Sequence, residues 1–183
     1  MRGTSGQGGG AGDLKQNDFS RDLQYSLDQR ECEWFDSFYY RIFPGLDRIE
    51  LVEDMARQKQ GVDKILHFKS GYKVTIDEKK RREDYGDIAL ETWSIWENRK
   101  RGWLYYCKCD YVVYAIMPAQ IAYLLPVLLL KRAWHEHGKV WLQKYKEFSS
   151  YNPGYTTKNI AVPVDVLLGA IAAEMKHKVC LTR

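Results

Sequence analysis

Two aspartates and a lysine stand at a spacing that allows them to share one site. Asp63 lies in the apolar segment GVDKIL, and Asp77 and Lys79 follow the segment YKVTI. Ser70-Gly71 stands about midway between Asp63 and Asp77. A tight turn at that dipeptide predicts an antiparallel hairpin in which the two carboxylates lie approximately abreast. Asp77 and Lys79 are two positions apart and share a face of their strand, whereas Glu78 points to the opposite face. We therefore expect two acids and a lysine to converge.

Carboxylates placed side by side repel each other unless a cation lies between them. Mg²⁺ suits such a pair, because it binds through one or two carboxylates together with waters and the phosphate oxygens of a substrate. The ion lowers the pKa of a bound water and neutralises charge that develops on a phosphodiester, while Lys79 steadies the attacking water or the transition state. This set of residues is suited to phosphodiester hydrolysis.

The same residues resemble the motif of the PD-(D/E)xK nuclease superfamily. Asp63 matches the first acid, Asp77 the second acid and Lys79 the lysine, whereas Val62 stands where the motif name has proline. The segments GVDKIL, TIDEK, IALETWS and RGWLYYCKCDYVVYA resemble successive blocks of small phage-type or resolvase-like members, over about residues 31–114. The resemblance implies a restriction-endonuclease-like core, a central mixed β-sheet flanked by helices, with Mg²⁺ or Mn²⁺ as cofactor and DNA as the usual substrate.

Further acids and an amide are candidates for the same site. The resemblance implies an additional metal-binding acid from the first helix, and Glu31 is favoured over Glu33 because it lies on the apolar, inward face. Glu91 is either a further acid near the metal or a strand residue paired with a nearby cation. Gln60 precedes Asp63 closely, where its amide would bind a phosphate or a metal-bound water; the alternative is an ordinary polar loop.

Basic residues gather in two short runs beside these candidates. Six of them are predicted to contact nucleic acid: Lys80, Arg81, Arg82, Arg99, Lys100 and Arg101. The chain has 28 Lys and Arg against 24 Asp and Glu, a net charge of +4, so these runs concentrate a small overall excess. Contacts to the phosphate backbone and salt-dependent binding are the expectation. The competing interpretation is that both runs are solvated loops.

Two alternatives compete with a nuclease. The pattern D-x-K is common by chance, and DEKKRR is also typical of a polar hairpin edge. A non-catalytic nucleic-acid-binding or interaction protein with the same fold is the main functional alternative, although the intact acids and lysine argue against it. The form of the substrate stays open between duplex, branched and single-stranded nucleic acid, and so does a homodimer.

The elements that position these residues follow from the spacing of apolar side chains. We expect a helix over about 17–42, strands over 47–52, 62–69, 72–78, 88–95, 102–108, 111–115 and 155–162, and helices over 126–137 and 164–175. Gly138 is expected to end the helix that precedes it. Residues 1–13 are predicted to be a flexible Gly-rich tail, and 14–183 a single mixed α/β (α+β) domain.

The cysteines indicate the redox environment. Cys32, Cys107, Cys109 and Cys180 occur without a secretory signal sequence, which favours reduced structural thiols and a cytoplasmic protein. The spacing of Cys107-Lys108-Cys109 is wrong for a zinc knuckle, and its alternation predicts a strand. His135-Glu136-His137 is interpreted as structural, since the two imidazoles lie on different faces of a helix.

An uncharged stretch over residues 111–130 has the length of a membrane span. Pro118 and Pro126 interrupt it, its first half YVVYAIM is typical of a strand, and Pro126 suits the first turn of a helix. A buried strand, a turn, a second strand and a core helix explain the stretch more simply. We therefore expect no membrane association.

Overall fold

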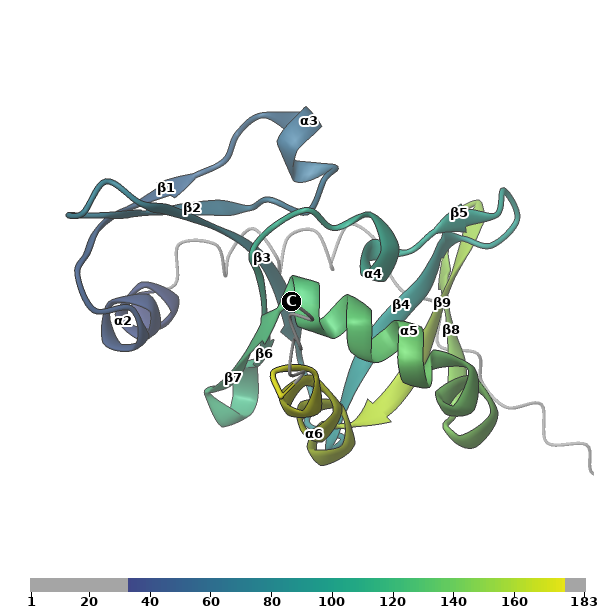
Figure 1. The fold of residues 1–183 in the computed structure, drawn as a ribbon. Coiled ribbons are helices and arrows are strands. Elements are labelled where there is room, and N and C mark those ends of the chain that lie inside the picture. The colour runs from purple at the N-terminus through teal and green to yellow at the C-terminus, as the bar shows by residue number, and fades with distance from the viewer. Residues whose placement is uncertain (1–32, 177–183) are drawn as a thin grey trace, which may run out of the picture.

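Residues 33–176 are described in the computed structural model of the chain, and they form two β-sheets with helices packed against them (Figure 1). In chain order the elements are α2 (Glu33–Ile42), β1 (Leu46–Leu51), α3 (Met55–Gln58), β2 (Lys64–Phe68), β3 (Lys73–Arg81), β4 (Asp87–Ile95), β5 (Lys100–Arg101), α4 (Trp103–Tyr106), β6 (Tyr111–Ile116), the 3-10 helix η1 (Met117–Ala119), β7 (Ile121–Pro126), α5 (Val127–Lys144), β8 (Glu147–Asn152), β9 (Tyr155–Pro163) and α6 (Val164–Glu174). The expected mixed α/β architecture, a mixed sheet flanked by helices, is confirmed.

The first sheet has the strand order β1-β2-β3-β6-β7. Neighbouring strands of this sheet are antiparallel, except for β3 and β6, which are parallel. The parallel pair arises because the chain leaves β3, builds β4, β5 and α4, and only then returns to the sheet as β6. The second sheet has the order β5-β4-β9-β8 and is antiparallel throughout.

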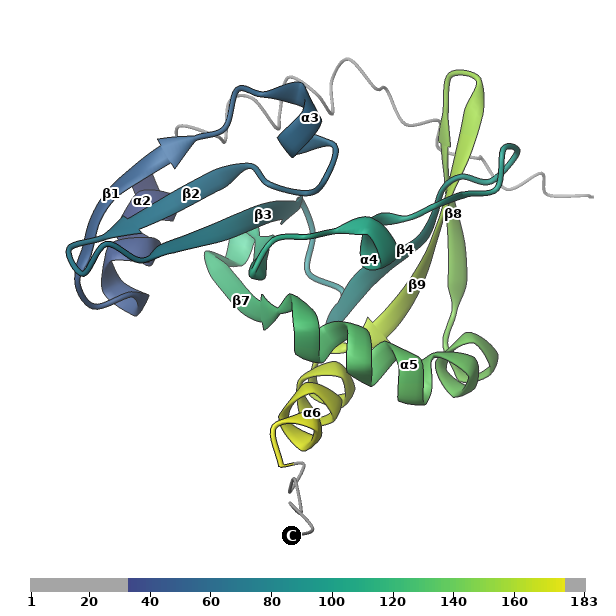
Figure 2. The same ribbon diagram turned by 45° about the horizontal axis from the view of Figure 1, so that its top comes forward.

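Side chains alternate between the two faces of the first sheet, as the pleat of a strand requires. One face packs on the aromatic residues of α2, with Leu66, Ile76 and Val113 in that core. The opposite face, which includes Ile65 and Val112, packs in a core shared with α4, α5, α6 and the second sheet. The first sheet therefore has α2 on one side and α4, α5 and α6 on the other (Figure 2).

The hairpin between β2 and β3 has the predicted register. Lys64 is paired with Ile76, so the positions just beyond this pair bring Asp63 and Asp77 together. The turn contains Gly71 at φ +87°, a left-handed conformation that glycine adopts without a steric penalty. The strand β3 continues past the predicted end at residue 78 to residue 81, because β6 pairs with it over that whole length.

The predicted strand over 102–108 is wrong. The segment forms the helical turn α4 followed by a loop that contains both Cys107 and Cys109. The buried side chains of this turn are Trp103 and Leu104. The amine of Lys131 donates hydrogen bonds to the carbonyl of Cys107 at 2.6 Å and that of Tyr105 at 3.2 Å, so α5 holds the end of this turn.

Two further boundaries differ from the sequence-based expectation. Gly138 does not end its helix, since α5 continues to Lys144. The indole of Trp134 lies on Gly138, and a Cβ there would stand 2.9 Å from the ring, so the glycine permits close packing within the helix. The strand β8 was not predicted. Its partner β9 and the helix α6 agree with the expected segments 155–162 and 164–175.

Several expectations concern residues outside the described range. These are the Gly-rich tail, the first part of the helix expected from residue 17, Glu31, Cys32 and Cys180. The uncharged stretch at 111–130 lies within that range and forms β6, η1, β7 and the start of α5. Between residues 33 and 176 there is no helix long and apolar enough to cross a membrane.

Candidate active site

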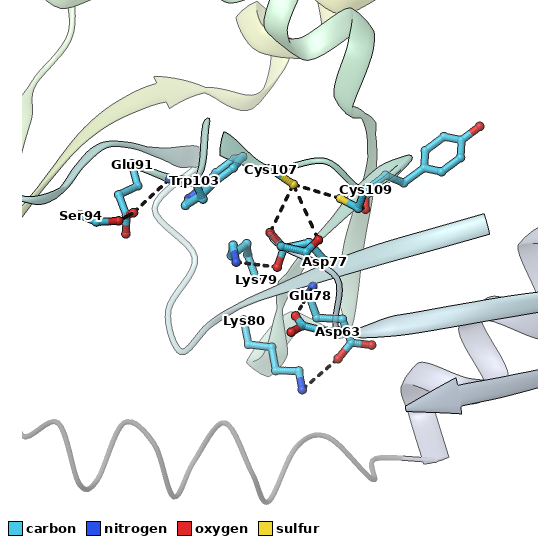
Figure 3. Close-up of polar contacts among 12 residues, drawn as sticks. Asp63, Asp77, Glu78, Lys79, Lys80, Glu91, Ser94, Trp103, Cys107 and Cys109 are labelled. Atoms are coloured by element: carbon cyan, nitrogen blue, oxygen red, sulfur yellow. Dashed lines mark hydrogen bonds and ion pairs between the residues drawn. The ribbon is translucent and has the colours of Figure 1, made fainter. Parts of the chain in front are cut away.

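The hairpin brings the two predicted acids and the lysine together on one face (Figure 3). The backbone N–H of Asp63 donates to the carbonyl of Ile76 at 2.8 Å, and the N–H of Glu78 donates to Asp63 Oδ2 at 2.9 Å. Lys79 Nζ donates to Asp77 Oδ1 at 2.6 Å. The Asp77 side chain is 1% exposed and that of Lys79 is 31% exposed, so solvent reaches the site at the lysine.

The charges of the three side chains perturb one another. Burial and the neighbouring Asp77 carboxylate raise the pKa of Asp63, while Lys79 and the N–H of Glu78 oppose that rise. Burial by itself would lower the pKa of Lys79, but the Asp77 and Asp63 carboxylates outweigh it and raise this pKa above its ordinary value. Lys79 is therefore a cation that donates hydrogen bonds. Both acids act on this cation, Asp77 through a hydrogen bond and Asp63 through its charge.

A glycine and two thiols line the far side of Asp77. Gly61 adopts φ +75°, and a Cβ at this residue would stand 3.1 Å from Asp77 Oδ2 and 2.9 Å from Cys107 Sγ. Cys107 Sγ lies 3.6 Å from Asp77 Oδ2 and 3.0 Å from Cys109 Sγ, and both thiols are free and buried. The loop after α4 thus approaches the acid closely, and any residue larger than glycine at position 61 would push it away.

The turn α4 covers Lys79 from the side of the second sheet. Trp103 presents its ring 5.8 Å from Lys79 Nζ, a cation–π contact. Glu91 accepts hydrogen bonds from the N–H of Trp103 at 3.1 Å and from the hydroxyl of Ser94. The carboxylate of Glu91 therefore positions α4 through these two donors, whereas one sequence-based alternative paired it with a nearby cation. The other alternative, a further acid near the metal, stays a prediction. Burial and the charge of Glu91 raise the pKa of the Tyr106 phenol on the same turn.

The opposite face of β3 carries a second acid and lysine that the sequence analysis missed. Glu78 accepts a hydrogen bond from the hydroxyl of Tyr39 at 2.7 Å and forms ion pairs with Lys64 at 2.9 Å and Lys80 at 3.1 Å. The side chains of Glu78, Lys64 and Lys80 are 3%, 1% and 6% exposed, beneath α2. A signal was present in the sequence, since DEKK contains the pattern acid-x-lysine twice in overlapping frames.

Two of the six basic residues predicted to contact nucleic acid are engaged inside the protein. Lys80 is buried against Glu78. Arg81 forms an ion pair with Asp87 and donates to the hydroxyl of Tyr114 at 3.2 Å. The expectation that these two side chains bind phosphate is corrected, because each faces an internal partner. The other four are exposed: Arg82, Arg99, Lys100 and Arg101.

The remaining candidates are located as follows. The side chain of Gln60 is exposed, while its backbone carbonyl accepts the N–H of Lys108 at 2.9 Å and so joins two loops of the site. The amide of the neighbouring Gln58 donates to the carbonyl of Val52 at 2.6 Å. Gln58 has a structural role. Glu31 lies outside the described residues, and the structure gives no information on it.

The capacity of the site to hold a divalent cation depends on its donor atoms. Over residues 33–176 no three His, Cys, Asp or Glu side chains form a group able to hold a metal ion. Asp63 and Asp77 supply two adjacent carboxylates in a buried, negatively charged setting, which fits Mg²⁺ or Mn²⁺, because these ions accept one or two carboxylates and take other oxygens from water and substrate. The residues present fit such an ion.

Comparison with known proteins found no relative of this chain. No protein-family model matches the chain, and neither a curated protein nor a solved structure matches it significantly. A functional conclusion therefore rests on the geometry of the site.

Proposed function

We propose that this chain is a Mg²⁺- or Mn²⁺-dependent nuclease of the PD-(D/E)xK type, with a restriction-endonuclease-like core, that hydrolyses phosphodiester bonds in DNA. One observation carries the proposal. Asp63 and Asp77 lie together where β2 and β3 meet, and Lys79 is bound to Asp77 on the same face, within reach of solvent. The mixed sheet flanked by helices is consistent with this class of protein.

The residues of the site have different roles in the proposed reaction. Asp63 and Asp77 would hold the ion, with Glu31 as the further acid that the resemblance implies. When bound, the ion lowers the pKa of a water and neutralises charge on the phosphodiester. Lys79 stays protonated because two carboxylates raise its pKa, so it acts as a hydrogen-bond donor to the attacking water or to a phosphate oxygen. General-base chemistry by Lys79 is not part of the proposal.

The exposed basic residues near α4 supply a surface for the phosphate backbone. Arg99, Lys100 and Arg101 lie at the end of the hairpin between β4 and β5. A binding protein without catalysis would need these cations as well, but it has no use for a lysine held 2.6 Å from one of two neighbouring acids. A homodimer and a cytoplasmic location remain predictions.

The decisive test is a cleavage panel. Linear, circular, branched and single-stranded DNA, together with RNA, are incubated with the chain in Mg²⁺, in Mn²⁺ and in EDTA. We expect cleavage in either metal and none in EDTA, with recovery after Mg²⁺ is restored. Asp77→Ala serves as the blank, and Asp47→Ala, which changes an exposed aspartate on β1, is the matched control. Cleavage that persists in EDTA, or in the Asp77→Ala protein, would falsify the proposal.

A further inference from the structure

A cluster of aromatic and basic side chains covers one face of the second sheet at the hairpin between β4 and β5. We name it the aromatic-basic patch, and it consists of Trp93, Trp96, Arg99, Arg101 and Lys158. The Arg99 guanidinium lies 3.9 Å from the centre of the Trp96 ring, and the Arg101 guanidinium lies 4.2 Å from that of Trp93. Lys158 Nζ lies 4.8 Å from the Trp96 ring.

The strand register explains why these residues share a face. Trp93 is paired directly with Arg101 on β5 and with Lys158 on β9, and directly paired residues project to the same side of a sheet. Trp96 follows at the end of β4 and meets Trp93 edge to face at 5.5 Å. Arg99 occupies the turn at φ +54°, a conformation in which glycine is the usual residue. The hairpin thus holds its cations against two rings.

The cations of the patch differ in the partners they have. Lys158 forms an ion pair with Glu147 at 3.1 Å. Arg99 and Arg101 are exposed, and within the part of the chain that the structure describes neither has a carboxylate partner. A guanidinium held over a ring by a cation–π contact still has N–H groups to donate, and these groups suit the oxygens of a phosphate. The patch is complementary to a polyanion.

Both indole rings are partly buried, and each has a cation over its face, so a planar group can stack on the exposed guanidinium groups or take the place of a cation on a ring. Bases in a single strand stack in this way on aromatic rings and arginine, whereas the bases of an intact duplex are occupied by their own stacking. We propose that the aromatic-basic patch binds an unpaired strand of nucleic acid, with bases stacked against its rings and guanidinium groups and phosphates bound by Arg99 and Arg101. This inference rests on the proposed nuclease function and specifies its substrate class.

The turn α4 joins the patch to the candidate active site. The Arg101 guanidinium also lies 4.7 Å from the ring of Tyr105, and Trp103 on the same turn contacts Lys79. Figures 1 and 2 both show α4 between β3 and the hairpin of β4 and β5. A strand bound at the patch therefore lies next to the lysine and the two acids, so the substrate is one in which an unpaired segment adjoins the bond that is cut.

The test measures binding in EDTA, where cleavage plays no part. The affinity of the full chain for a labelled oligothymidine and for a duplex of equal length is followed by fluorescence anisotropy. We expect Trp93→Ala with Trp96→Ala to weaken binding of the single strand about tenfold or more, and to leave duplex binding unchanged. Lys139→Gln, which removes an exposed charge on α5, is the matched control and is expected to bind both as the parent does. An unchanged single-strand affinity, or equal losses for both nucleic acids, overturns the inference.

A second variant tests the patch with a smaller change to the protein. Arg99→Lys keeps the charge at an exposed turn but removes the planar group, and circular dichroism checks that the protein remains folded. We expect weaker binding of the single strand; parental affinity would show that stacking at Arg99 contributes nothing. Failure of the two proposals is distinguishable. A chain that binds single strands through the patch but never cleaves lacks the proposed function, and one that cleaves while these variants bind normally lacks the proposed patch.

Discussion

The strand β3 presents the pattern acid-x-lysine on both of its faces, in two different settings. Asp77 and Lys79 lie on the face toward α4, where the lysine is 31% exposed. Glu78 and Lys80 lie on the face toward α2, where both side chains are almost completely buried. The two pairs are offset by a single residue in the sequence, yet they belong to different environments because successive side chains of a strand point to opposite sides.

The two acid-x-lysine pairs differ in the residues that surround them. Beneath α2, the carboxylate of Glu78 meets two lysines and a tyrosine hydroxyl, so its hydrogen-bonding and charge requirements are met by the protein. Toward α4, the carboxylates of Asp77 and Asp63 raise the pKa of Lys79, and this lysine is partly exposed to solvent. The pair beneath α2 has internal partners, Asp36 among them, and holds the fold together, whereas the pair toward α4 lies beside a second acid and within reach of solvent. Each of the following predictions tests that contrast.

The largest expected effect is on catalysis, at the face toward α4. Asp77→Asn keeps the shape of the side chain and removes its charge, so the site loses half of its carboxylate charge. We expect the cleavage rate to fall by about 10³-fold or more, which corresponds to ~4 kcal/mol in the barrier. Single-turnover kinetics in Mg²⁺ measure the rate, and a urea titration is expected to give a midpoint close to that of the parent. A rate near the parental one contradicts the role given to this acid.

The opposite face is expected to affect stability instead. Glu78→Ala leaves Lys80 buried without its carboxylate and leaves Lys64 with its longer ion pair to Asp36 at 3.4 Å. Removing one partner of a buried ion pair costs about 3–5 kcal/mol. The free energy of unfolding is obtained from urea denaturation. The folded fraction of the variant, assayed at a low temperature, should still cleave DNA. Loss of cleavage with unchanged stability would reverse the assignment of the two faces.

The two lysines give a matched pair with smaller effects. Lys79→Gln removes a charged donor from the site, and we expect kcat to fall about 10²-fold. We expect the free energy of unfolding to fall less than in the Lys80→Gln protein, because Lys79 is partly exposed. Lys80→Gln is expected to show the converse, a lower free energy of unfolding and a kcat close to that of the parent. Both variants are measured by steady-state cleavage and by urea denaturation side by side. Equal behaviour of the two would remove the distinction between the faces.

The smallest effect concerns an acid at the exposed edge of the same sheet. A hydrogen bond from His67, together with one from Arg48, lowers the pKa of Glu50 below its ordinary value. Because the folded-state pKa is depressed, this carboxylate stabilises the fold above the unfolded-state pKa, and the contribution disappears as the pH falls through the folded-state value. We therefore expect the free energy of unfolding of the Glu50→Gln protein to fall slightly less between neutral and acid pH than that of the parent. An identical acid limb would contradict the shift.

Local features of the sequence were sufficient to predict the candidate site. A Gly-containing turn and alternating apolar residues determine how β2 and β3 pair, and this register brings Asp63 and Asp77 together. The same alternation predicts that Glu78 points away from Lys79. These predictions succeed because a hairpin is formed by neighbours in sequence, and the direction of each side chain follows from the pleat.

What the sequence did not predict depends on partners that are distant along the chain. Lys80 and Arg81 face internal acids because α2 and β6 cover the end of β3. Residues 103–106 form α4 because Glu91 accepts the N–H of Trp103 and α5 supplies Lys131 to the other end of the turn. Tertiary contacts of this kind override the β-propensity of an aromatic segment such as WLYY.

The pairing of β4 with β9 imposes an order of events on folding. Asp87 lies opposite Pro163, so the main partner of β4 is among the last segments of the described chain to be synthesised. Contacts of long sequence separation form late, because a large loop must close first, whereas the hairpins of β1, β2 and β3 close locally. We therefore expect the acid pair to form early on a nascent chain. The surface that would present nucleic acid to it is completed only after β9 has emerged, and until then β4 is an unpaired edge exposed to other chains.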